Sequence, residues 1–261
     1  MRTELFRELW RYRELLYFFA WRDIKVRYRQ AALGVAWAVI QPLFTMLIFT
    51  LFFGRLARMP SDGIPYPIFA YCALVPWTYF SGVLGLAGNS LVGNASLITK
   101  VYFPRVLLPA AAAVAGLLDF VMSASLLAVM MVYYHVRPSW ALVFSPLVIL
   151  VMVVLTTGAS MFIAALNVRY RDVKYVLPFL IQIWLFVTPI IYPVTIIPER
   201  FRPILALNPC WAMVDGLRAC LFPGHSVDYR LLAASVAVAF AVFAVGAYYF
   251  HQAERSFADV I

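Results

Sequence analysis

The stretch VLLPAAAAVAGLLDFVMSASLLAVMMVYY, residues 106–134, decides the fold class of this chain. Asp119 is its only charged residue. About 20 apolar residues in a helix suffice to cross the ~30 Å hydrocarbon layer of a bilayer. The stretch therefore predicts a membrane-spanning helix, and the small residues that follow Pro109 would let a neighbouring helix approach closely.

The composition of the whole chain agrees with this prediction. The 261 residues are 64% hydrophobic and only 13% charged, whereas a soluble domain is nearer half apolar and a quarter charged. One globular core cannot bury so much apolar surface, so we expect an all-α, polytopic membrane protein. The net charge of +9 is interpreted as cations on the cytoplasmic side and not as a nucleic-acid surface, because no basic module with interleaved aromatic residues occurs.

Six apolar runs are long enough to span the bilayer. The second run contains Pro67, Pro76 and three glycines, so we expect it to be kinked or broken, with the freed backbone buried in protein or facing water. The six predicted spans, within a transmembrane domain that covers 33–261, are 33–54, 66–92, 106–134, 140–166, 174–193 and 229–250.

The distribution of cations predicts the orientation. With a cytoplasmic N-terminus, 14 of the 21 Lys and Arg residues fall on the cytoplasmic side, which favours both termini inside. The motif VRYR occurs at 26–29 and again at 168–171, each time before a span. Both copies lie on one face only if an even number of spans separates them, and four do.

The N-terminal stretch 1–32 is rich in charge, so we expect no cleavable signal peptide. Its apolar residues recur at helical spacing, which predicts an amphipathic helix in the headgroup plane, with an ordinary soluble cap helix as the alternative. Those apolar residues are Leu5, Leu9, Tyr12, Leu16 and Phe19. Four basic residues could meet anionic headgroups or a pyrophosphate-linked lipid, and cytoplasmic anchoring explains them equally well: Arg22, Lys25, Arg27 and Arg29.

The segment NASLITKVYFPR, 94–105, joins the second and third spans. Asn94 is a helix-start signal and Pro104 a stop, so we expect a compact helix over 94–104. This helix would carry apolar anchors for a groove and a cation for an acidic rim. It could equally pack on the protein's own cytoplasmic edge. Its candidate contact residues are Asn94, Leu97, Ile98, Lys100, Val101, Tyr102, Phe103 and Pro104.

The segment 196–224 is semi-apolar and is not expected to be a seventh span. Such a span would bury Asp215 and Arg218 at a cost of a few kcal/mol each, about 3 on insertion scales. We expect instead two short amphipathic helices that lie at the outer surface or dip into it. Asp215 and Arg218, three residues apart on one such helix, could pair locally.

Recognisable catalytic and nucleotide-binding motifs are missing from the sequence. It has no GxxxxGK[ST] loop, HExxH or GxSxG, and its three cysteines and three histidines form no metal-site pattern. Cys210 and Cys220 fall in one outer loop and could pair. Asp119 is the only acid well inside a span, and it could carry protons or hydrogen-bond a neighbour such as Ser123.

Two rows of aromatic residues follow the two VRYR motifs at helical spacing, and each row holds one glutamine. We expect the rows to line a translocation path if the protein moves a cargo; lipid-facing or packing surfaces are the alternative. The first row is Trp37, Gln41, Phe44, Ile48 and Phe52. The second is Tyr175, Phe179, Gln182, Phe186 and Ile190, with Tyr192 beyond it.

Four segments together resemble the membrane subunit of ABC-2 type polysaccharide exporters, which serve O-antigen, capsule and teichoic acid chains. They are RDIKVRYRQAALGVAWAVIQP (22–42), NVRYRDVKY (167–175), TPIIYPV (188–194), and NP (208–209) followed by Arg218. The resemblance covers nearly the whole chain. It departs at Ala31-Ala32, where relatives often have Ser.

The resemblance implies a homodimer of six-span permeases in a bacterial cytoplasmic membrane, bound to two separate ATPase subunits that hold ATP and Mg²⁺. It also implies that this chain needs no cofactor and performs no catalysis. The segment 94–104 would be a coupling helix that docks on the ATPase. Residues 196–224 would supply gate helices, with Trp211, Asp215 and Arg218 as gate residues. The alternatives are an ABC-2 exporter of a drug or small lipid, a proton-driven carrier that uses Asp119, and a membrane-integrated enzyme.

Overall fold

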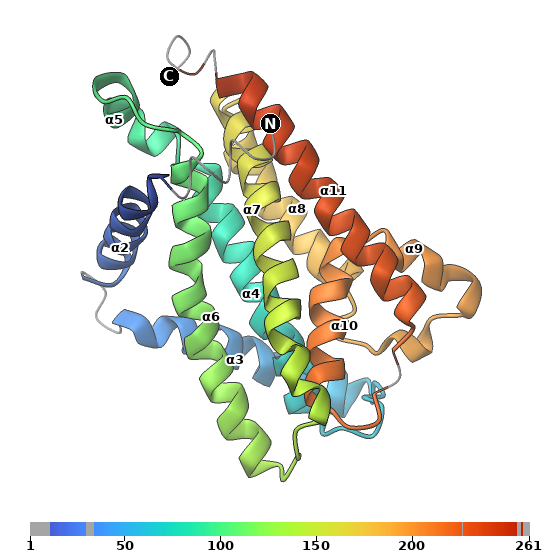
Figure 1. Ribbon diagram of the computed structural model, residues 1–261. Helices are drawn as coiled ribbons and strands as arrows, with labels where there is room; N and C mark the ends of the chain where they lie inside the picture. Colours follow the sequence, from blue (N-terminus) through green and yellow to red (C-terminus); the bar gives the residue numbers. More distant parts are fainter. Residues whose placement is uncertain (1–10, 30–33, 226, 255–256, 258–261) are drawn as a thin grey trace.

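The computed structural model describes residues 11–29, 34–225, 227–254 and 257, and these residues form helices and loops without a strand (Figure 1). The predicted apolar positions Leu5 and Leu9 lie outside the described residues. Five helical segments are long and apolar enough to cross a membrane. They are Trp37–Leu56, Tyr66–Gly88, Leu107–Tyr133, Trp140–Arg169 and Tyr229–Ala253.

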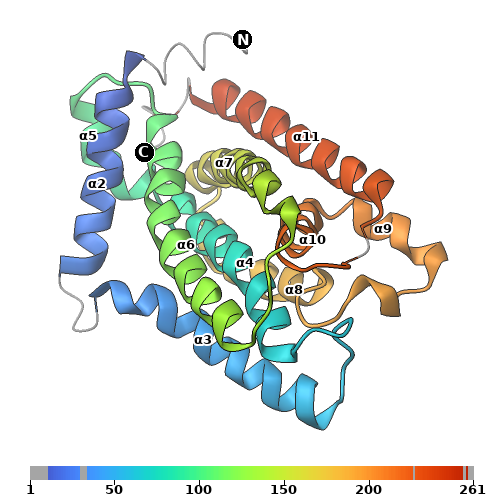
Figure 2. The ribbon, with the colours of Figure 1, turned by 60° about the horizontal axis from the view of Figure 1, so that its bottom comes forward.

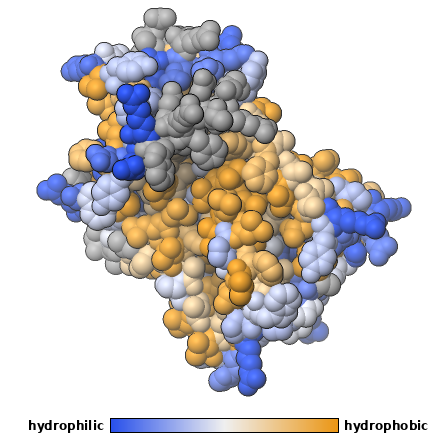
Figure 3. All heavy atoms as spheres, viewed as in Figure 1, coloured by the Kyte–Doolittle hydropathy of each residue, from blue (hydrophilic) through white to orange (hydrophobic). Residues whose placement is uncertain are grey.

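These segments confirm the all-helical membrane fold. The first consists of α3 (Trp37–Phe49) and a π-helix (Thr50–Leu56), and the next two are α4 (Tyr66–Gly88) and α6 (Leu107–Tyr133). The fourth joins a short 3₁₀ turn to α7 (Ser145–Arg169), and the last is α11 (Tyr229–Ala253). Figure 3 shows hydrophobic side chains across the middle of one face, with hydrophilic residues gathered toward its edges.

The predicted fifth span is shorter than expected. Helix α8 covers Val173–Val187, and its 15 residues give a length of about 22 Å, less than the hydrocarbon layer needs. The helix ends there because Thr188 precedes Pro189, and a residue before proline is disfavoured in the helical conformation; Thr188 is extended. Ile190 and Ile191 beyond it are buried in the core.

Helix α4 lies at the centre of the molecule (Figure 2). It packs against α3, α6, α7, α8 and α10, and most of its residues are buried. The predicted break is wrong, because α4 is one helix with Pro67 in its first turn and Pro76 in its interior. Proline is accepted in a membrane helix when neighbouring elements surround the backbone it leaves unpaired, and α4 has such neighbours on several sides.

Helices α7 and α11 pack together at two glycines. A Cβ atom built on Gly246 would lie 2.1 Å from the carbonyl oxygen of Gly158, and one on Gly158 would lie 2.3 Å from the Cα atom of Phe243. Real Cβ atoms do not approach other atoms so closely, so the two backbones can touch only because both residues are glycine.

The segment 196–224 forms α9 (Arg202–Ala206) and α10 (Pro209–Leu221), which meet at a bend of 108°. Counted as one broken span, this pair would raise the number of candidate spans from five to six. Nearly all residues of α10 are buried against α4, α7 and α11, so α10 does not lie on the surface of the molecule. The other predicted alternative, a helix that dips into the membrane, stays a prediction.

One end of the bundle gathers segments that are far apart in the sequence. Helix α5 (Ala95–Lys100), the end of α7 and the end of α11 lie there, and α2 (Arg13–Arg29) packs beside α6 (Figure 1). The backbone N–H of Arg105 donates to the Glu254 carboxylate at 3.1 Å, and Asn167 donates to the Gly88 carbonyl at 2.7 Å. The segments 93–105 and 167–174 and the end of α11 therefore share one side, as the charge count predicted. We refer to it as the α5 end.

Candidate translocation surface, docking segment and outer hairpin

The first aromatic row forms one exposed face of α3 and its π-helical extension. Trp37, Phe44, Ile48 and Phe52 are each at least half exposed, and Gln41 is exposed beside them. The opposite face carries Pro42, Met46 and Phe49, which are buried against the rest of the molecule. The row continues along the whole segment, so one face of α3 and its π-helical extension exposes aromatic side chains to the surroundings of the chain.

The second row follows α8. Tyr175, Phe179 and Phe186 are exposed, as is Gln182, whereas Leu177 is the buried residue of this helix. Ile190 does not belong to the row: the helix ends at Val187, and Ile190 is fully buried. Tyr192 is partly buried, and its hydroxyl donates to the Phe186 carbonyl at 3.2 Å. Helices α3 and α8 both pack on α4, which places the two rows on either side of one central helix (Figure 2).

The docking segment, residues 94–104, is helical only as far as Lys100. Asn94 makes no side-chain cap; it donates instead to the Ser90 carbonyl at 2.7 Å and accepts from Arg22 at 2.9 Å. The predicted helix over 94–104 is wrong at its end, because Val101 is extended. Since Phe103 precedes Pro104, the backbone there is also driven away from the helical region.

The side chains of the docking segment divide into an anchoring set and an exposed set. Ile98 and Phe103 are buried, and the Phe103 ring lies edge-on to that of Phe19 at 5.4 Å between centroids. Leu97 and Pro104 are partly buried. Lys100, Val101 and Tyr102 point outward, and Tyr102 is 94% exposed. An exposed aromatic side chain next to a buried, anchored one is typical of a contact surface.

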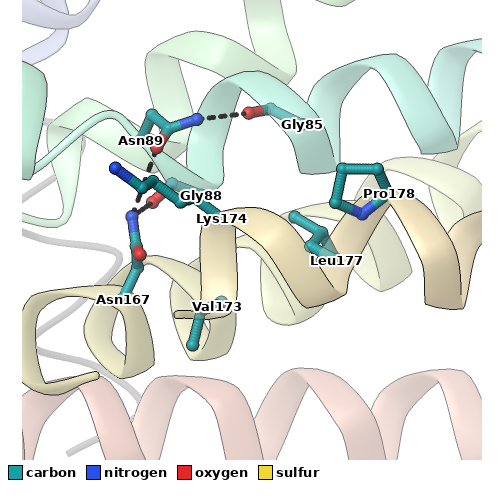
Figure 4. A pocket seen from close by; sticks show the side chains of 8 residues that line it. All are labelled: Gly85, Gly88, Asn89, Asn167, Val173, Lys174, Leu177 and Pro178. Carbon is teal, nitrogen blue, oxygen red and sulfur yellow. Dashed lines mark hydrogen bonds between the residues drawn. The ribbon is translucent and has the colours of Figure 1, made fainter. Parts of the chain in front are cut away.

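A small cavity lies where α4, α7 and α8 meet at the α5 end (Figure 4). Its volume is about 60 Å³, and Gly85, Gly88, Asn167 and Lys174 are among the residues around it. Asn167 is 3% exposed and bridges the Gly88 carbonyl and the Asn89 side chain, 2.7 and 3.3 Å away. The asparagine of the NVRYR motif therefore connects the ends of α4 and α7, a role that sequence reasoning missed.

Arg218 of α10 is fully buried and binds backbone carbonyls of other elements. Its Nη1 donates to Pro189 at 2.7 Å, and its Nη2 donates to Ile190 at 3.0 Å and to Phe69 at 3.4 Å. The predicted local pair with Asp215 is therefore wrong. The cost of burying the Arg218 charge was the argument against an inserted helix. The hydrogen bonds to these carbonyls offset that cost. Arg218 thus joins α10, α4 and the chain after α8.

Asp215 pairs with His225 in the loop that follows α10, with 2.8 Å between Oδ1 and Nε2. Both side chains are buried, and sequence reasoning did not single out His225. Trp211, the third predicted gate residue, is 1% exposed. Trp211, Asp215 and Arg218 therefore lie inside the hairpin that α9 and α10 form, and they do not line its surface. Asp215 and His225 are ten residues apart and separated by a turn, so their spacing gives no periodic signal that sequence analysis could have used.

Asp119 binds Arg27 and Tyr28 of α2, and both contacts join its carboxylate to the C-terminal turn of that helix. The predicted bond to Ser123 is wrong; the Ser123 hydroxyl donates to the Ala38 carbonyl of α3 at 2.8 Å. Of the four predicted headgroup residues, Arg22 and Arg27 are bound to protein partners. Lys25 and Arg29 are exposed.

The cysteines are free and buried. Cys210 and Cys220 lie ten residues apart on the single helix α10, which separates them by about 15 Å along its axis, too far for a disulfide. The pairing that the sequence left open is therefore excluded by the helix itself.

Several known proteins are similar in sequence to this chain over most of its length. The "O-antigen export system permease protein RfbA" of Myxococcus xanthus is 34% identical over 98% of this chain and 99% of that protein. A protein of the same name from Klebsiella pneumoniae is 29% identical over 92% of each chain. The "Polysialic acid transport protein KpsM" of Escherichia coli is 24% identical over 78% of this chain and 80% of that protein.

The family model described as ABC-2 type transporter matches residues 14–222, which include both aromatic rows, the docking segment and the buried part of the hairpin. The resemblance noted from the motifs at 22–42 and 167–175 is thereby confirmed. This chain belongs to the ABC-2 type transporter family.

Proposed function

We infer that this chain is the membrane-spanning subunit of an ATP-driven exporter that moves a lipid-linked polysaccharide across a bacterial cytoplasmic membrane. The observation that carries the proposal is the similarity to an O-antigen export permease along nearly the full length of both chains. The aromatic rows on α3 and α8 supply the chemistry, because successive rings can stack on successive sugars without fixing a register. Two chains would form the complete permease, with the path between them.

Energy would come from a separate ATPase subunit that binds ATP and Mg²⁺. The docking segment offers a surface for such a partner: Tyr102 projects from an anchored backbone, with Val101 and Lys100 beside it. An aromatic anchor with a nearby cation suits a groove with an acidic rim. In this proposal the α5 end faces the cytoplasm, both termini are cytoplasmic, and the bend between α9 and α10 faces outward as a gate.

The contacts of the Asp119 carboxylate argue against a proton-driven carrier. A proton site must exchange its proton during transport, whereas this carboxylate is bound by the cation of Arg27 and the hydroxyl of Tyr28. The small-lipid or drug exporter differs only in its cargo, and the exposed aromatic rows favour a sugar polymer.

The test is co-purification of the permease with a tagged ATPase subunit from membranes, together with export of the polymer. Tyr102→Ala and Lys100→Ala should each reduce the recovered ATPase severalfold and reduce export in proportion. Tyr133→Ala is the matched control, because Tyr133 is an exposed tyrosine at the opposite end of the bundle. Unchanged recovery of the ATPase in both variants, or equal loss in the control, would remove the docking assignment.

A further inference from the structure

Helix α2 contacts the docking segment with its middle part. Phe19 packs against Phe103 with 5.4 Å between ring centroids, and the Arg22 guanidinium lies 5.1 Å from the Phe19 ring centroid. Arg22 also donates to the Asn94 side chain at 2.9 Å. The docking segment is therefore held at both ends by one face of α2, and a displacement of this segment must move α2 or break these contacts.

The C-terminal turn of α2 contacts the middle of α6 through charge. Arg27 and Tyr28 both bind the Asp119 carboxylate, and the side chains of Arg27 and Asp119 are 26% and 25% exposed. Burial and the hydrogen bond to Asp119 raise the pKa of Tyr28 to about 12, so the phenol keeps its proton throughout the physiological range. A carboxylate within a span is costly to leave unpaired, so α2 and α6 are held together at this level.

One turn further along α6, the same helix binds the start of α3. The Ser123 hydroxyl donates to the Ala38 carbonyl at 2.8 Å. Asp119 and Ser123 therefore hold the two sides of the joint between α2 and α3. Helix α6 itself begins directly after the docking segment, at Leu107. Two connections therefore run from the docking segment to the first aromatic row. One passes through α2 and the other through α6, and they meet at Asp119.

We propose that the cluster Arg27–Tyr28–Asp119 transmits movement of the docking segment to α3, so that binding of ATP by the partner changes the position of the first aromatic row. The proposal rests on the function proposed above. Asp119 acts as a positioning residue and does not contact the cargo. Arg27 and Tyr28 act through it and do not bind lipid headgroups.

The experiment measures the effect of ATP on the labelling rate of a cysteine placed on α3. Ile48→Cys is suited to this, because Ile48 is half exposed on the row and the native cysteines are buried. In the assembled complex, ATP should change the labelling rate by about fivefold, a typical size for coupling between distant sites. Arg27→Ala and Asp119→Asn should abolish this change and reduce export, while the ATPase still co-purifies and hydrolyses ATP.

Two further variants decide between transmission and simple folding support. The exchanged pair Arg27→Asp with Asp119→Arg should restore most of the response to ATP, because it restores the ion pair in the opposite sense. Glu14→Gln neutralises an exposed carboxylate on the same helix and should leave the response unchanged.

The inference is overturned if either single variant keeps the ATP-dependent labelling, or if the variants fail to assemble and the exchanged pair does not restore them. The inference is also overturned if ATP leaves the labelling of the Ile48→Cys protein unchanged while the ATPase co-purifies. Failure of the ATPase to co-purify with the otherwise native chain would contradict the proposed function instead. The two failures are therefore distinguishable in one series of measurements.

Discussion

The guanidinium carbon of Arg218 lies 3.7 Å from the centroid of the Phe69 ring, and the Arg218 Nη2 also donates to the Phe69 carbonyl at 3.4 Å. One residue of α4 thus receives the buried cation of α10 through both its ring and its backbone. Both contacts depend on a planar group with several donors. A lysine at this position has one compact ammonium and cannot reproduce the arrangement.

Arg218→Lys should therefore destabilise the protein by about 2–3 kcal/mol, because it removes charge-assisted hydrogen bonds inside the protein. The measurement is the thermal unfolding midpoint of the purified protein in detergent at fixed detergent concentration. Arg137→Lys is the control, since Arg137 is exposed. That control should change stability by less than about 0.5 kcal/mol. Equal shifts in both variants would contradict the role given to Arg218.

The contact between α7 and α11 makes a second prediction. Gly246→Ala would place a methyl group 2.1 Å from the Gly158 carbonyl oxygen, so the two backbones must separate. We expect a loss of about 3 kcal/mol or more, seen as a lower unfolding midpoint and aggregation on gel filtration. Gly82→Ala adds the same methyl group to α4 where no atom lies within 4 Å. It should be neutral or stabilising by up to about 1 kcal/mol. A tolerated Gly246→Ala would mean that the close packing is not required.

The sequence predicted the long elements well because lipid imposes a minimum length on any spanning helix. The span predicted at 106–134 begins and ends within one residue of the helix Leu107–Tyr133. The aromatic rows were also found correctly as helical faces, apart from Ile190. The spacing of the residues in each row is a local property, so a single sequence suffices to predict it.

The polar partners could not be predicted, because they come from distant parts of the chain. Spacing alone suggested Asp215 with Arg218 and Asp119 with Ser123, since residues three or four apart share a helix face. The actual partners are a loop histidine, backbone carbonyls of other elements and the helix α2. The end of α8 could have been found: the pair Thr188-Pro189 is a local stop signal within the predicted span.

The aromatic rows make a third prediction, on transport. Phe44→Ala and Phe179→Ala each remove an exposed ring from one row, so export should fall by about fivefold, the scale of one lost aromatic contact. Assembly with the ATPase subunit should be unchanged, because neither residue belongs to the docking segment. Phe240→Ala removes an equally exposed ring from α11 and should leave export intact. Unchanged export in both row variants would assign these faces to lipid or packing.

Asn208 makes a fourth prediction, because its side chain connects α8 and α10. Its Oδ1 accepts from Trp184 Nε1 at 2.9 Å and from the Cys210 N–H at 3.1 Å, and its Nδ2 donates to Thr188 Oγ1 at 3.0 Å. The residue caps α10 and holds the end of α8 against it. Asn208→Ala leaves buried donors unpaired, which should cost about 2–4 kcal/mol.

A double-mutant cycle separates this connection from general damage to the fold. Trp184→Phe removes the indole donor, so Asn208→Ala should cost about 1 kcal/mol less in that background than in the native chain. Trp140→Phe, at a residue that is 80% exposed, should leave the cost of Asn208→Ala unchanged. The free energies come from denaturant titration in detergent, where two-state behaviour can be checked with two probes. Full additivity with Trp184→Phe would show that the bond from Trp184 to Asn208 does not hold α8 to α10.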